Sequence, residues 1–157
     1  MQSSLAFFLI LAVAPAPRDL NTSDDFVIEF LCAEETTTSP LFSITHAAQF
    51  DGGLRLFLNT DNPDAVAGLL TADSLQAQLS DHQSETATAV GLSLGKAVWC
   101  DQDSAPVYLR YADPLPICDG KPPARIEYFF EVPVTLGPDQ DLAIGQDPNF
   151  LWLIGKP

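Results

Sequence analysis

The most recognisable chemical pattern in this chain surrounds Ser93. Residues 91–95 (GLSLG) match G-x-S-x-G, the spacing around the nucleophilic serine of α/β-hydrolases. In that arrangement the serine follows a strand, and the acid and the histidine come later in the chain. Here both histidines, His46 and His82, precede Ser93, and residues 91–95 have the small-residue alternation of a continuous strand. We therefore interpret Ser93 as a packing residue and assign no catalytic residue.

The two histidines offer little for other catalytic designs. His46 is expected at the end of a strand, close in sequence to Asp51, and His82 in a polar loop beside Asp81. We expect both side chains at the surface or at a sheet edge. The chain contains no H-E-x-x-H pattern, phosphate-binding loop or dinucleotide-binding glycine pattern.

Two short acidic patterns are candidates for binding a cation. Each is an Asp-Gln-Asp triplet, and the carboxylates are Asp101, Asp103, Asp139 and Asp141. Calcium takes six to eight oxygen ligands, often from closely spaced carboxylates in loops. The twelve-residue EF-hand pattern is absent, however, and aspartate is also an ordinary turn residue. We assign no metal ligand and no cofactor, and keep these four residues as weak candidates for calcium.

The three cysteines carry more information. Cys100 is expected to end one strand and Cys118 the next segment, so a disulfide between them would close the loop that separates them. Closing a loop of this size stabilises a fold by about 3 kcal/mol in the chain-entropy model. Cys32 is left over. It is either a buried free thiol or a residue that pairs with another chain.

The charge of the chain excludes some classes of partner. Seven basic and 21 acidic residues give a net charge of −14. Nucleic-acid binding requires clustered lysine and arginine, but the basic residues here are scattered. An anionic membrane surface is disfavoured for the same reason. The acidity is typical of a soluble surface that repels copies of itself.

The N-terminal stretch predicts export. Residues 5–14 form an apolar run of ten residues, too short for a membrane-spanning helix but right for the core of a signal peptide. Ala-x-Ala patterns follow, each next to a proline that would hinder cleavage, so a retained tether or a first core strand is the alternative. We expect a leader at residues 1–17, a polar linker at 18–25, and membrane contact only through 5–14.

The rest of the chain, residues 26–157, is expected to form a single β-rich domain. Strand-like alternation recurs from residue 26 to the C-terminus, and Asp51-Gly52-Gly53 has the composition of a hairpin turn. Asn62, Pro63 and Asp64 form a helix start, which predicts one or two short helices around residues 63–79. Short strands separated by turn signals favour an antiparallel β-sandwich or a jelly-roll-like domain.

These observations favour a binding or structural accessory module over an enzyme. We expect an exported, periplasmic or secreted, non-catalytic domain that acts through a surface on a protein partner, as a subunit of an envelope or extracellular assembly. A retained apolar segment would tether it. Two alternatives stay open: a small secreted hydrolase assisted by calcium, and a structural protein of a virion or appendage.

Overall fold

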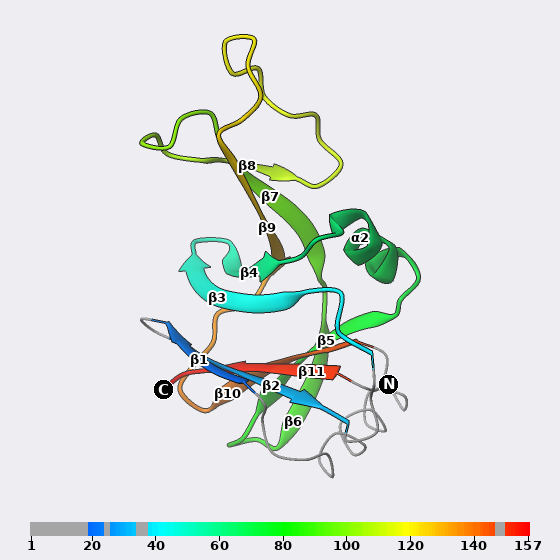
Figure 1. The fold of residues 1–157 in the computed structure, drawn as a ribbon. Helices are drawn as coiled ribbons and strands as arrows, with labels where there is room; N and C mark the ends of the chain where they lie inside the picture. The colour runs from blue at the N-terminus through cyan, green and yellow to red at the C-terminus, as the bar shows by residue number, and fades with distance from the viewer. Residues whose placement is uncertain (1–18, 24–25, 34–37, 147–149) are drawn as a thin grey trace.

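The chain forms two antiparallel sheets that pack face to face (Figure 1). The computed structural model describes residues 19–23, 26–33, 38–146 and 150–157. The six-stranded sheet has the order β1-β2-β11-β10-β5-β6 and consists of β1 (Asp19–Ser23), β2 (Phe26–Cys32), β5 (Leu75–Asp81), β6 (Thr86–Val90), β10 (Gln140–Gln146) and β11 (Phe150–Gly155). The five-stranded sheet has the order β3-β4-β9-β7-β8 and consists of β3 (Ser43–Phe50), β4 (Gly53–Asn59), β7 (Ser93–Trp99), β8 (Val107–Arg110) and β9 (Arg125–Val132). The predicted β-sandwich is confirmed.

Apolar residues that alternate along the strands form the core between the sheets. Leu54 and Leu56 of β4 are fully buried, as the alternation in the sequence predicts. Phe42, just before β3, places its ring 4.5 Å from that of Trp152 and edge-on to Phe130 at 5.1 Å. These aromatic contacts join β11 of one sheet to β9 of the other.

One helix, α2 (Pro63–Thr71), connects the two sheets. The Asn62 side chain caps it by accepting the Ala65 N–H at 3.1 Å, so the predicted helix start is confirmed. The prediction of helix as far as residue 79 was wrong, because residues 75–81 are strand β5. Leucines four residues apart share a face in a helix and also in a strand, and pairing with β10 decides for the strand.

Two further segments differ from the sequence-based expectation. Residues 91–95, expected as continuous strand, are strand only from Ser93, because β6 and β7 belong to different sheets and the chain crosses between them at Gly91 and Leu92. The segment 18–25, expected as a linker, contains β1, whose backbone pairs with β2. Polar composition hid this strand, because ladder hydrogen bonds come from the backbone. The predicted leader, residues 1–17 with the apolar run 5–14, lies outside the described residues.

Between β7 and β9 the chain projects beyond the sandwich. We call residues 100–124, which include β8 and the loops on either side of it, the arm (Figure 1). The pairing of β7 with β9 continues for three residue pairs past the end of the pairing between β4 and β9, and it leads into the arm. No helix in the described residues is long and apolar enough to cross a membrane.

Candidate functional site

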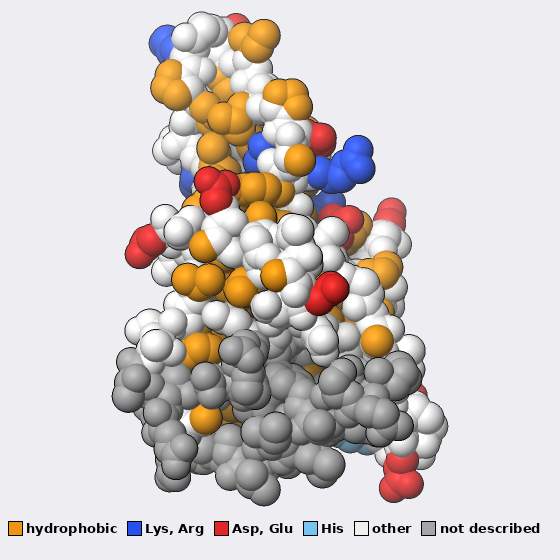
Figure 2. All heavy atoms as spheres, turned by 90° about the vertical axis from the view of Figure 1, so that its right-hand side faces the viewer, with side chains coloured by type: hydrophobic (Ala, Val, Ile, Leu, Met, Phe, Trp, Pro, Cys, Tyr) orange, Lys and Arg blue, Asp and Glu red, His pale blue; other side chains and the backbone are white. Residues whose placement is uncertain are grey.

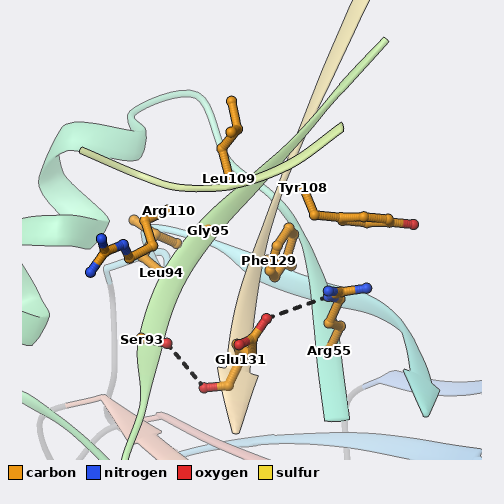
Figure 3. Close-up of a pocket in the computed structure, with 9 residues that line it drawn as sticks. All are labelled: Arg55, Ser93, Leu94, Gly95, Tyr108, Leu109, Arg110, Phe129 and Glu131. Carbon is orange, nitrogen blue, oxygen red and sulfur yellow. Dashed lines mark hydrogen bonds and ion pairs between the residues drawn. The ribbon is translucent and has the colours of Figure 1, made fainter. Parts of the chain in front are cut away.

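The outer face of the five-stranded sheet is hollowed next to the arm (Figure 3). The cavity measures about 260 Å³. Its lining includes Ser93 and Gly95 of β7, Glu131 of β9, Arg55 of β4 and Tyr108 of β8. A second hollow of about 370 Å³ shares Ser93 and Glu131 with the first. Four neighbouring strands therefore bring polar and aromatic groups to one face.

Arg55 is held rigidly in this cavity. Its guanidinium lies between the rings of Phe50 and Tyr108, 4.0 Å and 3.9 Å from their centroids. Its Nε donates to Glu131 Oε1 at 3.4 Å. Two aromatic faces and one carboxylate thus fix the side chain.

The cavity contains the serine of the G-x-S-x-G pattern, but neither histidine lines it. The Ser93 hydroxyl donates to the carbonyl oxygen of Glu131 at 3.5 Å. His46, in β3, is stacked on Phe57 with ring centroids 4.5 Å apart, and its Nδ1 lies 3.1 Å from the Thr45 hydroxyl. The structure does not bring a histidine to Ser93.

Gly95, the last residue of that pattern, has a packing role. It lies opposite Phe129 in the pairing of β7 with β9, and the Phe129 ring lies across it. A Cβ at Gly95 would come within 2.6 Å of this ring and 3.0 Å of the Leu109 carbonyl oxygen. The glycine therefore makes room for a buried aromatic ring on the outer face of the sheet.

The calcium candidates fall into two separate places. Asp139 and Asp141 lie at the start of β10, beside the turn that follows β5. There His82 Nε2 lies 2.6 Å from Asp141 Oδ2, and Gln83 Nε2 donates to Asp139 Oδ2 at 2.7 Å. The hydrogen bond and the negative charge of Asp141 raise the pKa of His82.

The other two candidates, Asp101 and Asp103, are exposed in the arm at the opposite end of the molecule (Figure 1). The fold therefore does not bring the two Asp-Gln-Asp triplets together. Within the described residues, no group of three or more histidine, cysteine, aspartate or glutamate side chains is arranged to hold a metal ion.

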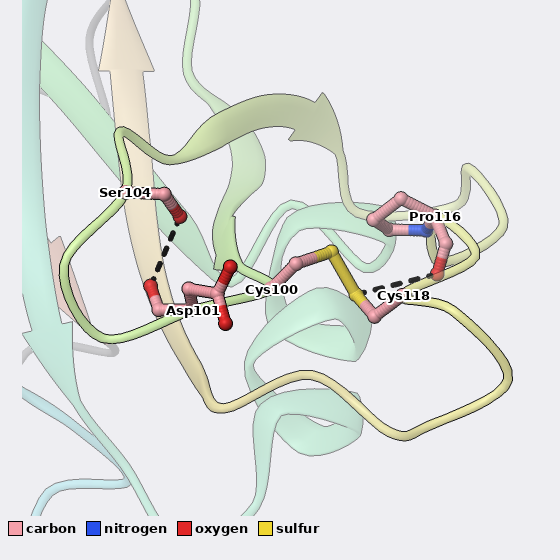
Figure 4. Close-up of a disulfide and its surroundings, with 5 residues drawn as sticks. All are labelled: Cys100, Asp101, Ser104, Pro116 and Cys118. Atoms are coloured by element: carbon pink, nitrogen blue, oxygen red, sulfur yellow. Dashed lines mark hydrogen bonds between the residues drawn. A yellow bond between two sulfur atoms is a disulfide. The ribbon is translucent and has the colours of Figure 1, made fainter.

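The predicted disulfide between Cys100 and Cys118 is present and staples the arm (Figure 4). Directly after it, Asp119 and Gly120 both have positive φ, 53° and 75°, and the Lys121 N–H donates to the Cys118 carbonyl at 3.0 Å. This is a tight turn of the kind that Asp-Gly favours. Cys32 is buried and forms no disulfide within the chain.

Two side chains fasten the base of the arm to the body. Lys96 of β7 is buried, and its Nζ donates to the carbonyl oxygens of Tyr111, at 2.9 Å, and of Asp113. The Tyr111 hydroxyl donates to a carboxylate oxygen of Asp64 in helix α2. That hydrogen bond raises the pKa of Tyr111 to about 12. The arm is therefore tied to the sheet and to the helix.

The outer part of the arm presents large apolar side chains to solvent (Figure 2). Five large hydrophobic residues are exposed in the described part of the chain, and four of them lie between residues 107 and 117. Val107, Tyr108 and Leu115 are each 46% exposed, and Ile117 is 90% exposed. The sequence reasoning missed this surface. The available signal was a proline-rich loop containing leucine and isoleucine next to a cysteine.

Comparisons of the chain with protein families, with curated proteins and with solved structures find no match.

Proposed function

We propose that this chain is an exported binding module without catalytic chemistry of its own, which serves as an accessory subunit by contacting a protein partner through the arm. One observation carries the proposal: four of the five exposed large hydrophobic side chains of the described residues lie on this projecting segment. Single exposed apolar residues are ordinary on a protein surface, but four of them within one short segment are typical of an interaction site.

The way the arm is built supports a role in binding. The disulfide, the buried Lys96 and the bond between Tyr111 and Asp64 fix its base, so its side chains need little ordering when a partner binds. The disulfide is also compatible with an oxidising compartment, as expected for an exported protein.

The test compares two exposed hydrophobic surfaces of the same chain. The full chain is isolated in its native state from cells that produce it, and the mass of its assembly is measured by size-exclusion chromatography with light scattering. The double variant Leu115→Ser/Ile117→Ser should lose the associated protein. Leu41→Ser, at the one exposed large hydrophobic residue that the described part of the chain has outside the arm, should keep it. An unchanged assembly in the double variant would contradict the proposal.

A labelling experiment separates this function from the hydrolase alternative. The wild-type chain is incubated with a fluorophosphonate probe that reacts with activated serines. We expect no labelling, because neither histidine lines the cavity that contains Ser93. Labelling of the wild type that disappears in Ser93→Ala would contradict the binding module and support the hydrolase alternative.

A further inference from the structure

We infer that Ile117 is the anchor residue of the arm and enters an apolar pocket on a protein partner whose surrounding surface is positively charged. This inference rests on the proposed function and adds the contact residue and the chemistry of the partner.

The exposure of Ile117 distinguishes it from the other apolar residues of the arm. Its side chain is 90% exposed, about twice the fraction of Val107, Tyr108 or Leu115. Leaving an isoleucine in water forgoes the stabilisation that burial of its side chain would contribute. An interface would recover that burial, and residues that fill a pocket at the centre of an interface dominate binding.

The backbone is restricted on both sides of Ile117. Pro114 and Pro116 have fixed φ, and each restricts the residue before it to extended conformations. Cys118 follows directly, tied by its disulfide to Cys100 and by the tight turn to Lys121. Isoleucine is also β-branched and has few rotamers. Little conformational freedom is therefore lost when Ile117 enters a pocket.

The charge of the arm and of the whole chain indicates which kind of partner binds this surface. The arm contains four carboxylates and two basic side chains: Asp101, Asp103, Asp113 and Asp119 against Arg110 and Lys121, which leaves a net charge of −2. The whole chain carries −14. A second copy or an anionic membrane would be repelled, whereas a protein with a positively charged surface is attracted over the same contact.

The experiment begins with photocrosslinking in the cells that produce the protein. A benzoylphenylalanine is placed in the full chain at the exposed Leu115, which leaves the anchor Ile117 in place, and, as a control, at Gln102, an exposed arm residue on the other side of β8. We expect one discrete adduct from position 115, containing a protein of basic isoelectric point. That protein is then purified and titrated with the wild-type chain.

In this titration, Ile117→Ala should weaken binding at least about tenfold, and raising NaCl from about 0.05 M to about 0.5 M should weaken it further. Leu41→Ala should bind as the wild type does. Because Ile117 contacts solvent almost fully, the melting temperatures of Ile117→Ala and the wild type should agree, so that a loss of binding is not a loss of folding.

The outcomes distinguish this inference from the proposed function. An absence of protein adducts at position 115, or adducts identical to those at position 102, contradicts both. Three results would overturn the inference but leave the binding module standing. They are an adduct with an acidic protein, binding that does not change with salt concentration, and an Ile117→Ala variant that binds as tightly as the wild type. Adducts to a second copy or to lipid overturn the choice of partner.

Discussion

At the level of single residues, Gly95 shows that the G-x-S-x-G pattern is compatible with two interpretations, a catalytic turn and close packing within a strand. The last glycine of G-x-S-x-G is required in a hydrolase by the sharp turn at the nucleophile. Here it lies within a strand, and the ring of the buried Phe129 occupies the space where a side chain would be. Gly91, the first glycine of the same pattern, has nothing within 4 Å of a Cβ. The two glycines therefore separate the packing reading from the catalytic one.

We predict that Gly95→Ala lowers the free energy of unfolding by about 1–3 kcal/mol, because the methyl group must displace the Phe129 ring or the Leu109 carbonyl. Gly91→Ala, the matched control, should stay within about 0.5 kcal/mol of the wild type. Urea unfolding measures both. Equal effects of the two substitutions would refute the packing role of Gly95.

The contact between His82 and Asp141 leads to a second prediction about single residues. Since Asp141 stabilises the imidazolium, the pKa of His82 in the folded protein lies above 6.5, its usual value. A raised pKa means that the stabilising contribution of the pair is complete at acidic pH, below the unfolded pKa, and is lost as the pH rises through the folded pKa. An NMR titration of the ring should show a midpoint above 6.5 that falls in Asp141→Asn. A midpoint unaffected by that substitution would rule out the pairing.

At the scale of elements, the arm is a segment of irregular structure that depends on its attachments. β8 is only four residues long and pairs with β7 alone, so strand pairing contributes little to its position. The disulfide closes the arm directly after β7, and Lys96 donates hydrogen bonds to the segment that follows β8. The disulfide can be removed without changing the core cluster, whereas Lys96 is buried on the same face of β7 as the core residue Leu94.

Removing the disulfide should weaken the protein without abolishing its fold. We predict that Cys100→Ser/Cys118→Ser lowers the free energy of unfolding by about 3 kcal/mol in the chain-entropy model, while the β-sheet signal in far-ultraviolet circular dichroism persists. Cys32→Ala supplies the comparison for the loss of a thiol outside the arm. Peptide mapping of native wild-type material without reduction should recover Cys100 and Cys118 in one linked fragment. Recovery of both as free thiols would contradict the bridge.

Lys96 should matter to stability although it is a charged residue in a strand. Lys96→Met preserves most of the side-chain volume but leaves the carbonyls of Tyr111 and Asp113 without this donor, at a cost of about 1–3 kcal/mol. Lys121→Met replaces an exposed lysine of the arm and should leave the free energy of unfolding unchanged. Thermal unfolding of the two variants compares them directly. A neutral Lys96→Met would mean that the arm keeps its position without this contact.

The elements also show which features the sequence could predict. Alternation identified the buried faces of β2, β4, β9 and β11, because each strand has one face in the core. Helix and strand could not be separated at Leu75 and Leu79, where a spacing of four satisfies both. β1 was missed because its polar residues pair through the backbone. The disulfide followed from two cysteines expected at strand ends, whereas the exposure of Ile117 depends on how far the arm extends from the body.

For the molecule as a whole, the sandwich and the arm differ in the side chains that they expose. The two sheets enclose the core, and the body carries no other comparable group of exposed apolar side chains in its described residues. The long strands β7 and β9 carry the arm beyond the second sheet, so its apolar residues can reach a partner while the acidic body stays solvated (Figure 1). This separation is the physical basis for regarding the chain as a binding module.

Hydrogen–deuterium exchange of the native complex, compared with the free chain, tests this view most directly. We predict that binding slows exchange at backbone amides of residues 107–121. Exchange in the body, including the strands around the cavity at Ser93, should not change. Slower exchange at β7 and β9 beside Ser93, Arg55 and Glu131, with the arm exchanging as it does in the free chain, would contradict it.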